Sequence, residues 1–375
     1  MRSTARLISK LPLYWSFRSL GKPLLLPFNL TISTTYRTNS KCKTCNIWQI
    51  QKKIPLGKEL TLEEWEKILR SLGDSLYWIT ISGGEPFLGC FIEKDLVEII
   101  KVINEYNKPK IINIPTNGIL WKIIPRKVKE ILETISPETY LVINFSIDGI
   151  GTDHDQIRGV PNNYILLKKA YEEVVKLKTI YQNLIVGVHT VISSWNVDKI
   201  PIIYDTIMKE FKPDQYISEI AEERNEMENF GQGITPLPEK YAKAVNYLVE
   251  QIEEGLKQGK WEGLTKITEL FRAEYYKIAR DFYLTKKQQI SSYAGYASAH
   301  ISPTGDVWEC AVYATSMGNL RDYDYDFRKL WNSRKAWQVR KRVKKHHSCP
   351  LANEHYSNIL LSPKYIYKAM KKVYY

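Results

Sequence analysis

The chain has 375 residues, of which 44% are hydrophobic and 25% are charged, and its formal net charge is +13. These proportions are typical of a globular protein and exclude a disordered one. The length is enough for one large domain with a smaller one. No apolar run approaches the roughly 18 to 20 residues of a membrane-spanning helix. The five cysteines are a sparse, odd set, so we expect a protein of the reducing cytoplasm without a disulfide framework.

Residues 1–25 combine many apolar side chains with Arg6, Lys10 and Arg18. These charges, and the lack of a small-residue cleavage site after them, argue against a secretory signal. Two interpretations stay open. The segment is either a helix packed on the rest of the protein or a basic amphipathic segment lying on a membrane surface.

The positive charge is dispersed, with much of the excess in the segments Arg340 to His347 and Lys368 to Lys372. An excess of this sign can serve an anionic partner. No base-stacking motif or Arg-rich recognition pattern accompanies it, however. We therefore expect a solvated helical face and no nucleic-acid partner.

Between about residues 28 and 220, β-branched runs alternate with segments of helical periodicity. The expected strands are Asn29–Thr35, Tyr77–Ser82, Lys110–Pro115, Leu141–Ile147, Leu184–Ile192 and Gln215–Ile220. The expected helices are Leu62–Leu72, Ile92–Tyr106, Ile124–Ile135, Tyr164–Leu177 and Val197–Phe211. Such alternation implies parallel strands joined by right-handed crossovers. It leaves open a partial α/β barrel and an open doubly wound sheet.

The sequence changes in character after these units. A helical connector is expected up to residue 290, and short β runs and turns follow it. We therefore divide the chain into an N-terminal segment (1–25), a core (26–230), a helical connector (231–290) and a smaller α+β extension with a C-terminal tail (291–375).

The first two expected strands are followed by residues that suggest chemistry. Cys42 and Cys45 come after the first strand, and two cysteines at this spacing in a reducing compartment are typical of a metal or redox site. Gly83, Gly84 and Glu85 come after the second strand. Adjacent glycines let a ligand approach the backbone, and the glutamate adds a carboxylate.

The third and fourth strands end in the same way, with Asn117 after the third and with Ser146 and Asp148 at the end of the fourth. The carboxyl ends of parallel strands point to one face, which is where barrel enzymes build their active sites. One such turn would be unremarkable, but four in succession predict a functional site.

This combination resembles the radical S-adenosylmethionine (SAM) family over roughly residues 28–225. In that family a C-x3-C-x2-C loop after the first strand holds a [4Fe-4S] cluster and leaves one iron open for SAM. The resemblance implies a partial (β/α)6 barrel, with Cys42 and Cys45 as the second and third cluster ligands. The residues that it assigns to SAM binding are Gly83, Gly84, Glu85, Pro86, Asn117, Ser146 and Asp148.

One position departs from the family pattern, because Thr38 stands where the first cysteine is expected. A thiolate is a soft anionic ligand that suits iron-sulfur clusters, whereas a hydroxyl is hard and poorly ionised. An inactive descendant, an altered ligand set and an introduced substitution all stay open. Cys90, four residues after Pro86, is a candidate third thiolate. The alternative for Cys90 is a small buried residue that opens the next helix.

The extension resembles the auxiliary-cluster module of radical SAM enzymes, called SPASM or twitch, in the stretches 301–310, 318–320, 330–332 and 349–353. That module uses several more cysteines than Cys310 and Cys349, so it is degenerate here. Together with His347, these two residues suggest a mixed Cys/His site for iron or zinc. The alternative is an extension that has kept its packing and lost its metal.

Two more residues lie at strand ends. His189, on the fifth strand, either faces the barrel interior or is a satisfied core histidine. Arg224, after the sixth strand, either pairs with the carboxylate of SAM or belongs to a solvated charge run.

The resemblance implies an enzyme that cleaves SAM with an electron from the cluster and abstracts hydrogen from an unidentified substrate. A ferredoxin or flavodoxin would supply the electron. The alternatives are a SAM-binding scaffold without a cluster, and a basic protein that binds nucleic acid or a membrane surface. The aromatic residues, the apolar N-terminus and the basic charge favour a lipid substrate slightly over a peptide or nucleotide. We expect a cytoplasmic location, with peripheral membrane contact as the variant.

Overall fold

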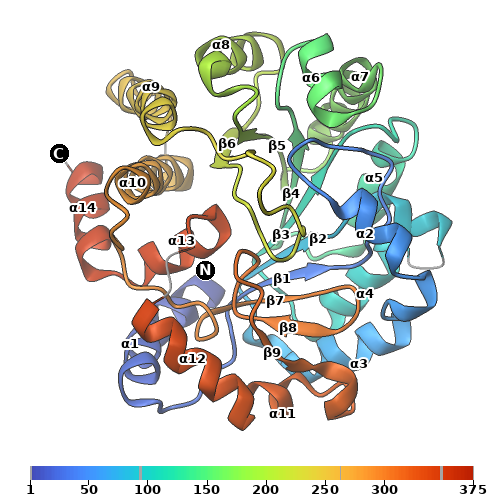
Figure 1. Ribbon diagram of the computed structural model, residues 1–375, viewed down its shortest axis with the longest axis vertical. Helices are drawn as coiled ribbons and strands as arrows, with labels where there is room; N and C mark the ends of the chain where they lie inside the picture. Colours follow the sequence, from blue (N-terminus) through green and yellow to red (C-terminus); the bar gives the residue numbers. More distant parts are fainter. Residues whose placement is uncertain (1, 93–94, 262, 347–348, 375) are drawn as a thin grey trace.

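The computed structural model describes residues 2–92, 95–261, 263–346 and 349–374. Its centre is one nine-stranded sheet with the strand order β6-β5-β4-β3-β2-β1-β7-β8-β9, and helices surround it (Figure 1). The strands of the core are β1 (Asn29–Ser33), β2 (Trp78–Ser82), β3 (Ile111–Thr116), β4 (Tyr140–Ser146), β5 (Leu184–Ile192) and β6 (Gln215–Ile220).

These six strands are all parallel, and each pairs with its neighbour in the sequence. A doubly wound sheet would reverse its strand order at one point, so the partial barrel is the correct alternative. The α-helices of this part are α2 (Ile47–Lys53), α3 (Leu62–Leu72), α4 (Leu96–Tyr106), α5 (Ile124–Thr134), α6 (Thr152–Arg158), α7 (Asn163–Lys176) and α8 (Ile200–Glu210). Short 3-10 turns are η1 (Leu56–Lys58), η2 (Gly73–Ser75), η3 (Pro86–Phe91), η4 (Leu177–Thr179) and η5 (Val197–Lys199).

The C-terminal extension continues the barrel sheet. Its first strand, β7 (Ser298–Ile301), is parallel to β1, with Asn29 opposite Ser298. The strands β8 (Asp306–Trp308) and β9 (Ser316–Asn319) then add antiparallel pairs. The extension and the barrel therefore share one set of backbone hydrogen bonds. The helices that follow are η6 (Leu320–Tyr323), α11 (Phe327–Trp331), α12 (Arg334–His346), α13 (Ala352–Leu360) and α14 (Pro363–Tyr374).

The open side of the barrel, between β1 and β6, is bridged by α13. Asn29 at the start of β1 donates from Nδ2 to the Asn353 carbonyl at 2.8 Å and to Ser357 Oγ at 2.9 Å. On the other side, the Ala352 backbone nitrogen donates to Glu219 Oε2 of β6 at 3.2 Å. The connector helices α9 (Pro238–Lys257) and α10 (Gly263–Thr285) pack on each other, and α10 also contacts α13.

The N-terminal helix α1 (Arg2–Leu20) packs on the protein, as the first of the two interpretations predicted. The Tyr14 hydroxyl donates to the Leu26 carbonyl at 2.6 Å, and Trp15 Nε1 donates to the Leu361 carbonyl at 2.7 Å. Phe17 is fully buried and makes an edge contact with Tyr296. Among the described residues, no helix is both long enough and apolar enough to cross a bilayer.

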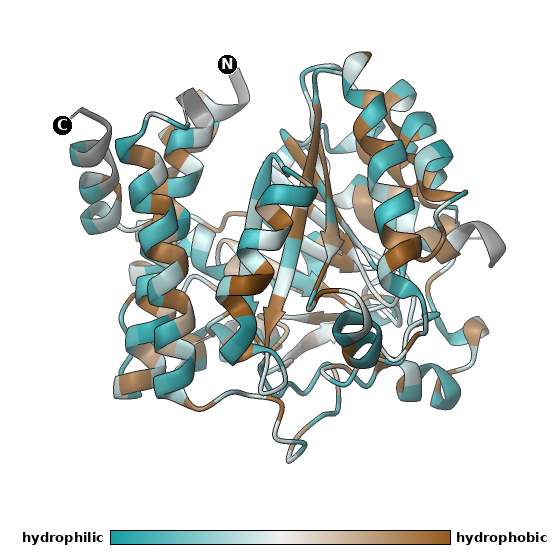
Figure 2. Ribbon diagram, turned by 90° about the horizontal axis from the view of Figure 1, so that it is seen from above, coloured by the Kyte–Doolittle hydropathy of each residue, from teal (hydrophilic) through white to brown (hydrophobic). Residues whose placement is uncertain are grey.

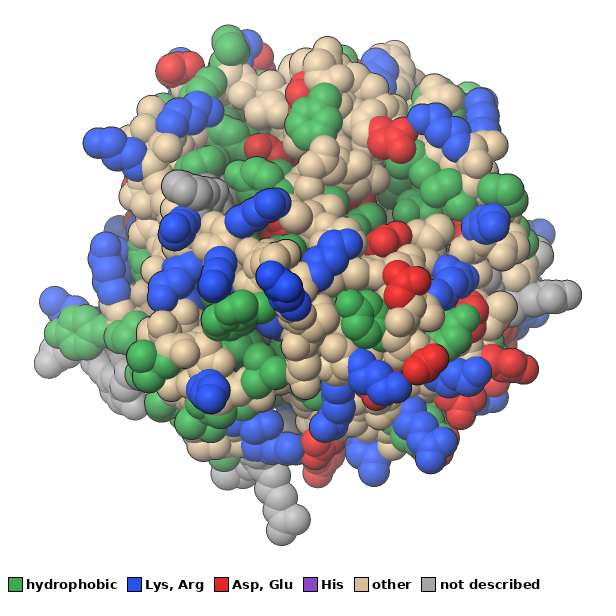
Figure 3. All heavy atoms as spheres, turned by 60° about the horizontal axis from the view of Figure 1, so that its bottom comes forward, with side chains coloured by type: hydrophobic (Ala, Val, Ile, Leu, Met, Phe, Trp, Pro, Cys, Tyr) green, Lys and Arg blue, Asp and Glu red, His purple; other side chains and the backbone are tan. Residues whose placement is uncertain are grey.

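The buried side chains form one large cluster that joins the strands to the inner faces of the helices, and Figure 2 shows hydrophobic residues along both. Lys and Arg side chains are spread over the face seen in Figure 3, where acidic and hydrophobic ones lie among them. The expectation of a solvated face holds for most of the basic residues of α12 but is wrong for Arg340. That side chain is 1% exposed, and its guanidinium lies 4.3 Å from the ring centre of Trp331.

Candidate functional site

The barrel strands enclose a cavity of about 820 Å³, which we call the chamber. It is walled by inward-facing strand residues, by the loop after β1 and by residues around the start of α13. The predicted site residues in its wall are Thr38, Cys42, Cys45, Gly83, Gly84, Glu85, Asn117, Ser146, His189, Arg224, Cys310 and Cys349. The strand-end residues therefore converge as predicted, although Pro86 and Asp148 do not belong to the wall.

Gly83 and Gly84 line the chamber and also let two parts of the backbone approach closely. A Cβ on Gly83 would lie 2.5 Å from the Thr35 carbonyl oxygen, and one on Gly84 would lie 2.1 Å from that of Arg37. The loop after β1 thus lies where a side chain of either residue would stand, so only glycine fits at these two positions. Two backbone hydrogen bonds join the segments, from Gly84 to Thr35 at 2.7 Å and from Glu85 to Arg37 at 2.9 Å. The glycines therefore fix the loop that carries Cys42 and Cys45, which we call the cysteine loop, against the end of β2.

Glu85 is a buried carboxylate at the chamber wall and is 1% exposed. It accepts hydrogen bonds from Thr116 Oγ1 at 2.9 Å, from the Asn117 nitrogen at 2.8 Å and from the Phe87 nitrogen at 3.2 Å. Burial is the main influence and raises the pKa of Glu85 to about 7, although these donors oppose it. A carboxylate held in this way can receive a cationic group from the chamber.

Asn117 joins the third strand to the cysteine loop. Its Nδ2 donates to Asn39 Oδ1 at 2.8 Å and to Ser40 Oγ at 3.1 Å. This side chain therefore positions the loop, in addition to lining the chamber. Sequence reasoning placed Asn117 near SAM but did not anticipate this contact.

The prediction that Asp148 lines the SAM site needs correction. Asp148 is fully buried, and its Oδ1 accepts from the Val191 nitrogen at 2.8 Å. Its Oδ2 lies 2.8 Å from Arg158 Nε, and Arg158 is the residue that reaches the chamber wall. Arg158 was missed as a site residue, because an arginine at the end of a short helix carries no distinctive signal by itself. Asp148 therefore holds Arg158 in place.

The cysteine loop brings two thiols and one hydroxyl to the chamber. Arg158 Nη1 lies 3.8 Å from Cys42 Sγ, and burial raises the pKa of both thiols, that of Cys45 to about 12. The Thr38 hydroxyl accepts a hydrogen bond from the Ser40 nitrogen at 3.1 Å, so it stabilises the local turn. The side chain of Cys90 lies outside the described residues, and its role as a third thiolate stays a prediction.

Arg224 is buried, so its assignment to a solvated charge run is wrong. Its Nη2 lies 3.3 Å from Glu219 Oε1, and its Nη1 lies 3.9 Å from Glu226 Oε2. Its Nε is buried and has no hydrogen-bond partner among the described residues. The Arg224 guanidinium is therefore able to receive an anionic group in the chamber.

His189 also faces the chamber, and burial lowers its pKa.

A chain of polar side chains crosses the chamber and was missed altogether. Asn113 Nδ2 donates to Thr80 Oγ1 at 3.3 Å, and Asn144 Nδ2 donates to Asn113 Oδ1 at 2.7 Å. Gln215 Nε2 donates to Asn144 Oδ1 at 3.1 Å, and Arg272 continues the chain to Gln215 at 3.4 Å. We call this series the amide ladder. Its first four members occupy inward positions of β2, β3, β4 and β6, which a sequence shows only once the register is known, and Arg272 comes from α10.

In the extension, the structure brings together Cys310 and Cys349, which are 39 positions apart in the sequence. His347, the third predicted ligand, lies outside the described residues. Glu354 is the residue that joins the two cysteines, and ligand atoms of all three lie within 4.8 Å of one another. His355, although close in sequence, directs Nδ1 to the Leu351 carbonyl at 3.3 Å.

Comparison with known proteins gives the class to which this architecture belongs. Residues 32–207 match the radical SAM superfamily, and the chain belongs to that superfamily. Residues 293–353 match the iron-sulfur cluster-binding SPASM domain, so the chain is a radical SAM protein with a SPASM extension. Members of this superfamily are enzymes, and their cofactors are a [4Fe-4S] cluster and SAM.

Several curated proteins are similar in sequence. The sporulation killing factor maturation protein SkfB of Bacillus subtilis is 27% identical over 195 residues, which make up 50% of this chain and 43% of that protein. GTP 3',8-cyclase of Aquifex aeolicus is 27% identical over 193 residues, covering 48% and 52%. PqqA peptide cyclase of Bradyrhizobium diazoefficiens is 34% identical over 86 residues, covering 22% and 21%. The matched part spans about half or less of each relative.

Solved structures share the fold. SuiB of Streptococcus suis, bound to its precursor peptide SuiA, has a TM-score of 0.57 and 17% identity, with 89% of this chain and 70% of that chain covered. The protein anSMEcpe, with bound AdoMet and a peptide, has a TM-score of 0.57 and 18% identity, with 92% and 96% covered. The fold thus extends over nearly the whole chain.

The residues present fit SAM better than they fit the cluster. Glu85 offers a buried carboxylate to an ammonium, and Arg224 has a buried donor available for a carboxylate. The cluster needs soft thiolates, and two of the three loop positions, Cys42 and Cys45, provide them in the described part of the site. Thr38 provides a hydroxyl that the loop itself already uses.

Proposed function

We propose that this protein binds SAM at the carboxyl end of the barrel and holds a peptide segment in the chamber beneath it. The observation that carries the proposal is the position of Glu85. This carboxylate faces the chamber at the point where the cysteine loop, β2 and β3 meet. When bound, the family's cofactors supply one-electron chemistry that removes hydrogen from an unreactive carbon.

The residues have separate tasks in this proposal. Glu85 receives the ammonium of SAM, and Arg224 receives its carboxylate. Arg158, held by Asp148, keeps a positive charge beside Cys42. The burial of these groups excludes water, which strengthens each of these electrostatic contacts. An external reductant of the ferredoxin or flavodoxin class would supply the electron.

A peptide is the substrate class that we favour. The amide ladder offers side-chain amides, which donate and accept hydrogen bonds as peptide groups do. Relatives named above include a peptide cyclase, and two of the similar structures hold peptides. The slight preference for a lipid, drawn from composition, has no support among these relatives, and neither does membrane contact.

A second function is favoured by Thr38. A protein that binds SAM and peptide without forming the cluster would keep the pocket and lose the radical chemistry. The hydrogen bond from Ser40 to the Thr38 hydroxyl supports this alternative, because the loop is ordered by its own side chain at the position of the missing thiolate.

One experiment tests both the radical SAM enzyme and the scaffold without a cluster. The protein is reconstituted with iron and sulfide without oxygen and reduced, and SAM binding, iron content and 5′-deoxyadenosine are measured on the same sample. SAM binding with 5′-deoxyadenosine supports the enzyme. SAM binding without iron and without this product supports the scaffold, and absence of SAM binding contradicts both.

A further inference from the structure

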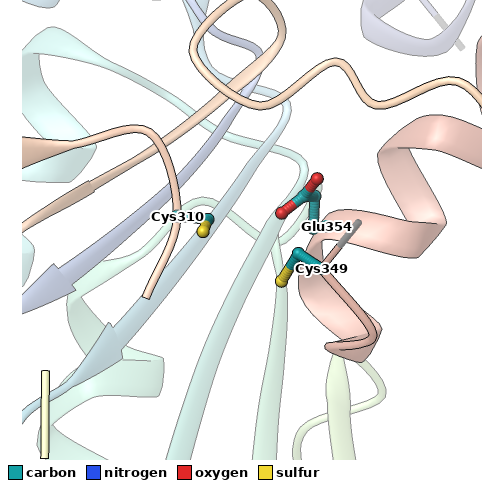
Figure 4. Close-up of side chains that lie close together, drawn as sticks. All are labelled: Cys310, Cys349 and Glu354. Atoms are coloured by element: carbon teal, nitrogen blue, oxygen red, sulfur yellow. The ribbon is translucent and has the colours of Figure 1, made fainter. Parts of the chain in front are cut away.

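The two cysteines and the glutamate of the extension form a compact group in the chamber wall. Cys310 follows β8, Cys349 precedes α13, and Glu354 lies in the first turn of α13. All three are buried, at 6%, 2% and 5% exposure respectively. Figure 4 shows the two sulfur atoms and the carboxylate turned toward a common space, with Cys310 on one side and the other two opposite it.

The donor set does not fit the [4Fe-4S] cluster that a SPASM domain implies. Such a cluster is held by cysteine thiolates, usually four. In the described part of the extension, Cys310 and Cys349 are the two thiols. We propose instead that Cys310, Cys349 and Glu354 bind a single divalent metal ion of the zinc type.

The chemistry of these ligands supports a single ion. Thiolates select zinc or iron, and a carboxylate oxygen is an accepted third ligand in a tetrahedral site. Two thiolates and one carboxylate carry three negative charges. A divalent ion offsets two of these charges, and binding of its ligands to the metal releases the thiol protons to solvent. Without the metal ion, burying these charges together would be costly.

The three ligands are also held in position by the surrounding structure. The Ser292 hydroxyl donates to Glu354 Oε1 at 2.6 Å and orients that carboxylate. The Tyr275 hydroxyl donates to the Pro350 carbonyl at 3.1 Å, which fixes the segment next to Cys349. Contacts of this kind around a metal site orient its ligands and raise its affinity.

Three protein ligands leave one position of a tetrahedral ion unfilled. Because Cys310, Cys349 and Glu354 all line the chamber, that position is available to water or to a donor atom of a bound substrate. Catalytic zinc sites have this arrangement, whereas structural sites use four protein ligands. The extension would then contribute a Lewis-acidic ion to the chamber.

Cobalt(II) is the probe for the test, because tetrahedral thiolate coordination gives it intense charge-transfer and visible absorption bands. The full chain, purified under reducing conditions and freed of metal, is titrated with Co²⁺ and then with Zn²⁺. We expect these bands at about one ion per chain, and we expect Zn²⁺ to remove them. Cys310→Ser and Cys349→Ser should abolish the bands. Glu354→Gln, which keeps the size of the side chain, should weaken binding about tenfold or more.

The matched control is the double variant Cys42→Ser/Cys45→Ser, which removes the thiols of the barrel loop and should leave the bands intact. SAM binding is measured on every variant, so that loss of the SAM site is recognised separately from loss of this site. The proposal is overturned if the bands depend on Cys42 and Cys45, if no bands appear, or if Cys310 and Cys349 retain iron together with acid-labile sulfide.

Discussion

The Asn117 backbone nitrogen donates a hydrogen bond to Glu85 Oε2 at 2.8 Å, which ties the end of β3 to the end of β2. The same Asn117 holds the cysteine loop through its side chain. Glu85 is therefore both a structural acceptor and the acidic group that faces the chamber. Glu85, the neighbouring cysteine loop and the strands below it can each be tested by substitution.

The first prediction concerns the ionisation of Glu85. Its pKa is raised to about 7 by burial, and it must be ionised to hold the ammonium of SAM. The affinity for SAM should therefore fall as the pH drops through about 7, approaching tenfold weaker one unit below. Calorimetric titration between pH 7.5 and 6 measures this. Glu85→Gln should bind SAM about tenfold more weakly at pH 7.5 and lose the pH dependence. An equal pH dependence in both proteins would contradict the assignment.

The second concerns Thr38. Thr38→Cys restores a soft ligand to the cysteine loop, so reconstitution without oxygen should raise the iron content toward about four per chain. Production of 5′-deoxyadenosine should rise with it. Thr38→Ser is the matched control, because it keeps the hydroxyl that accepts from Ser40 and adds no thiolate. Equal iron in the two variants would show that position 38 does not limit cluster assembly.

The third concerns the buried pair of Asp148 and Arg158, whose charged atoms are 2.8 Å apart. Asp148→Asn leaves a buried guanidinium without its counter-charge and should lower the free energy of unfolding by about 3 kcal/mol. Chemical denaturation measures the change. The double variant Asp148→Asn/Arg158→Met removes both charges and should recover part of the loss. If the double variant is no more stable than the single one, the pair is not coupled as described.

The fourth concerns Gly187, which lies on β5 beside the amide ladder. A Cβ there would lie 2.2 Å from Asn144 Oδ1. Gly187→Ala should therefore displace Asn144, weaken its hydrogen bonds to Gln215 and Asn113, and cost about 2 kcal/mol of stability. Gly57→Ala is the control, because nothing lies within 4 Å of its added Cβ. Similar melting temperatures for the two variants would contradict this account.

The core strands were predicted well because their burial pattern is local. The predicted bounds of β5, β6 and α3 agree with the structure. The start of α4 was predicted too early, because Asp95 caps this helix and directs its side chain to the Val97 nitrogen. Short-range patterns therefore specified most of the barrel.

The site was predicted less completely, because several of its contacts join distant segments. Glu354 becomes a candidate ligand only when α13 folds back beside Cys310. Asp148 was predicted to line the SAM site, and only the structure shows that its carboxylate is paired with Arg158. The amide ladder depends on strand register, which a single sequence does not display. Sequence reasoning thus found the residues at the strand ends and missed the contacts that join one strand or helix to another.

The pairing of β1 with β7 has a consequence for how the protein is made. Asn29, near the start of the chain, pairs with Ser298. The edge of β1 that faces β7 therefore stays unpaired until most of the chain has been synthesised. During that time an exposed strand edge can pair with another nascent chain. Contacts between such remote positions also slow folding. Truncation before β7 should therefore give an aggregation-prone product, and the extension protects the barrel before it serves any chemistry.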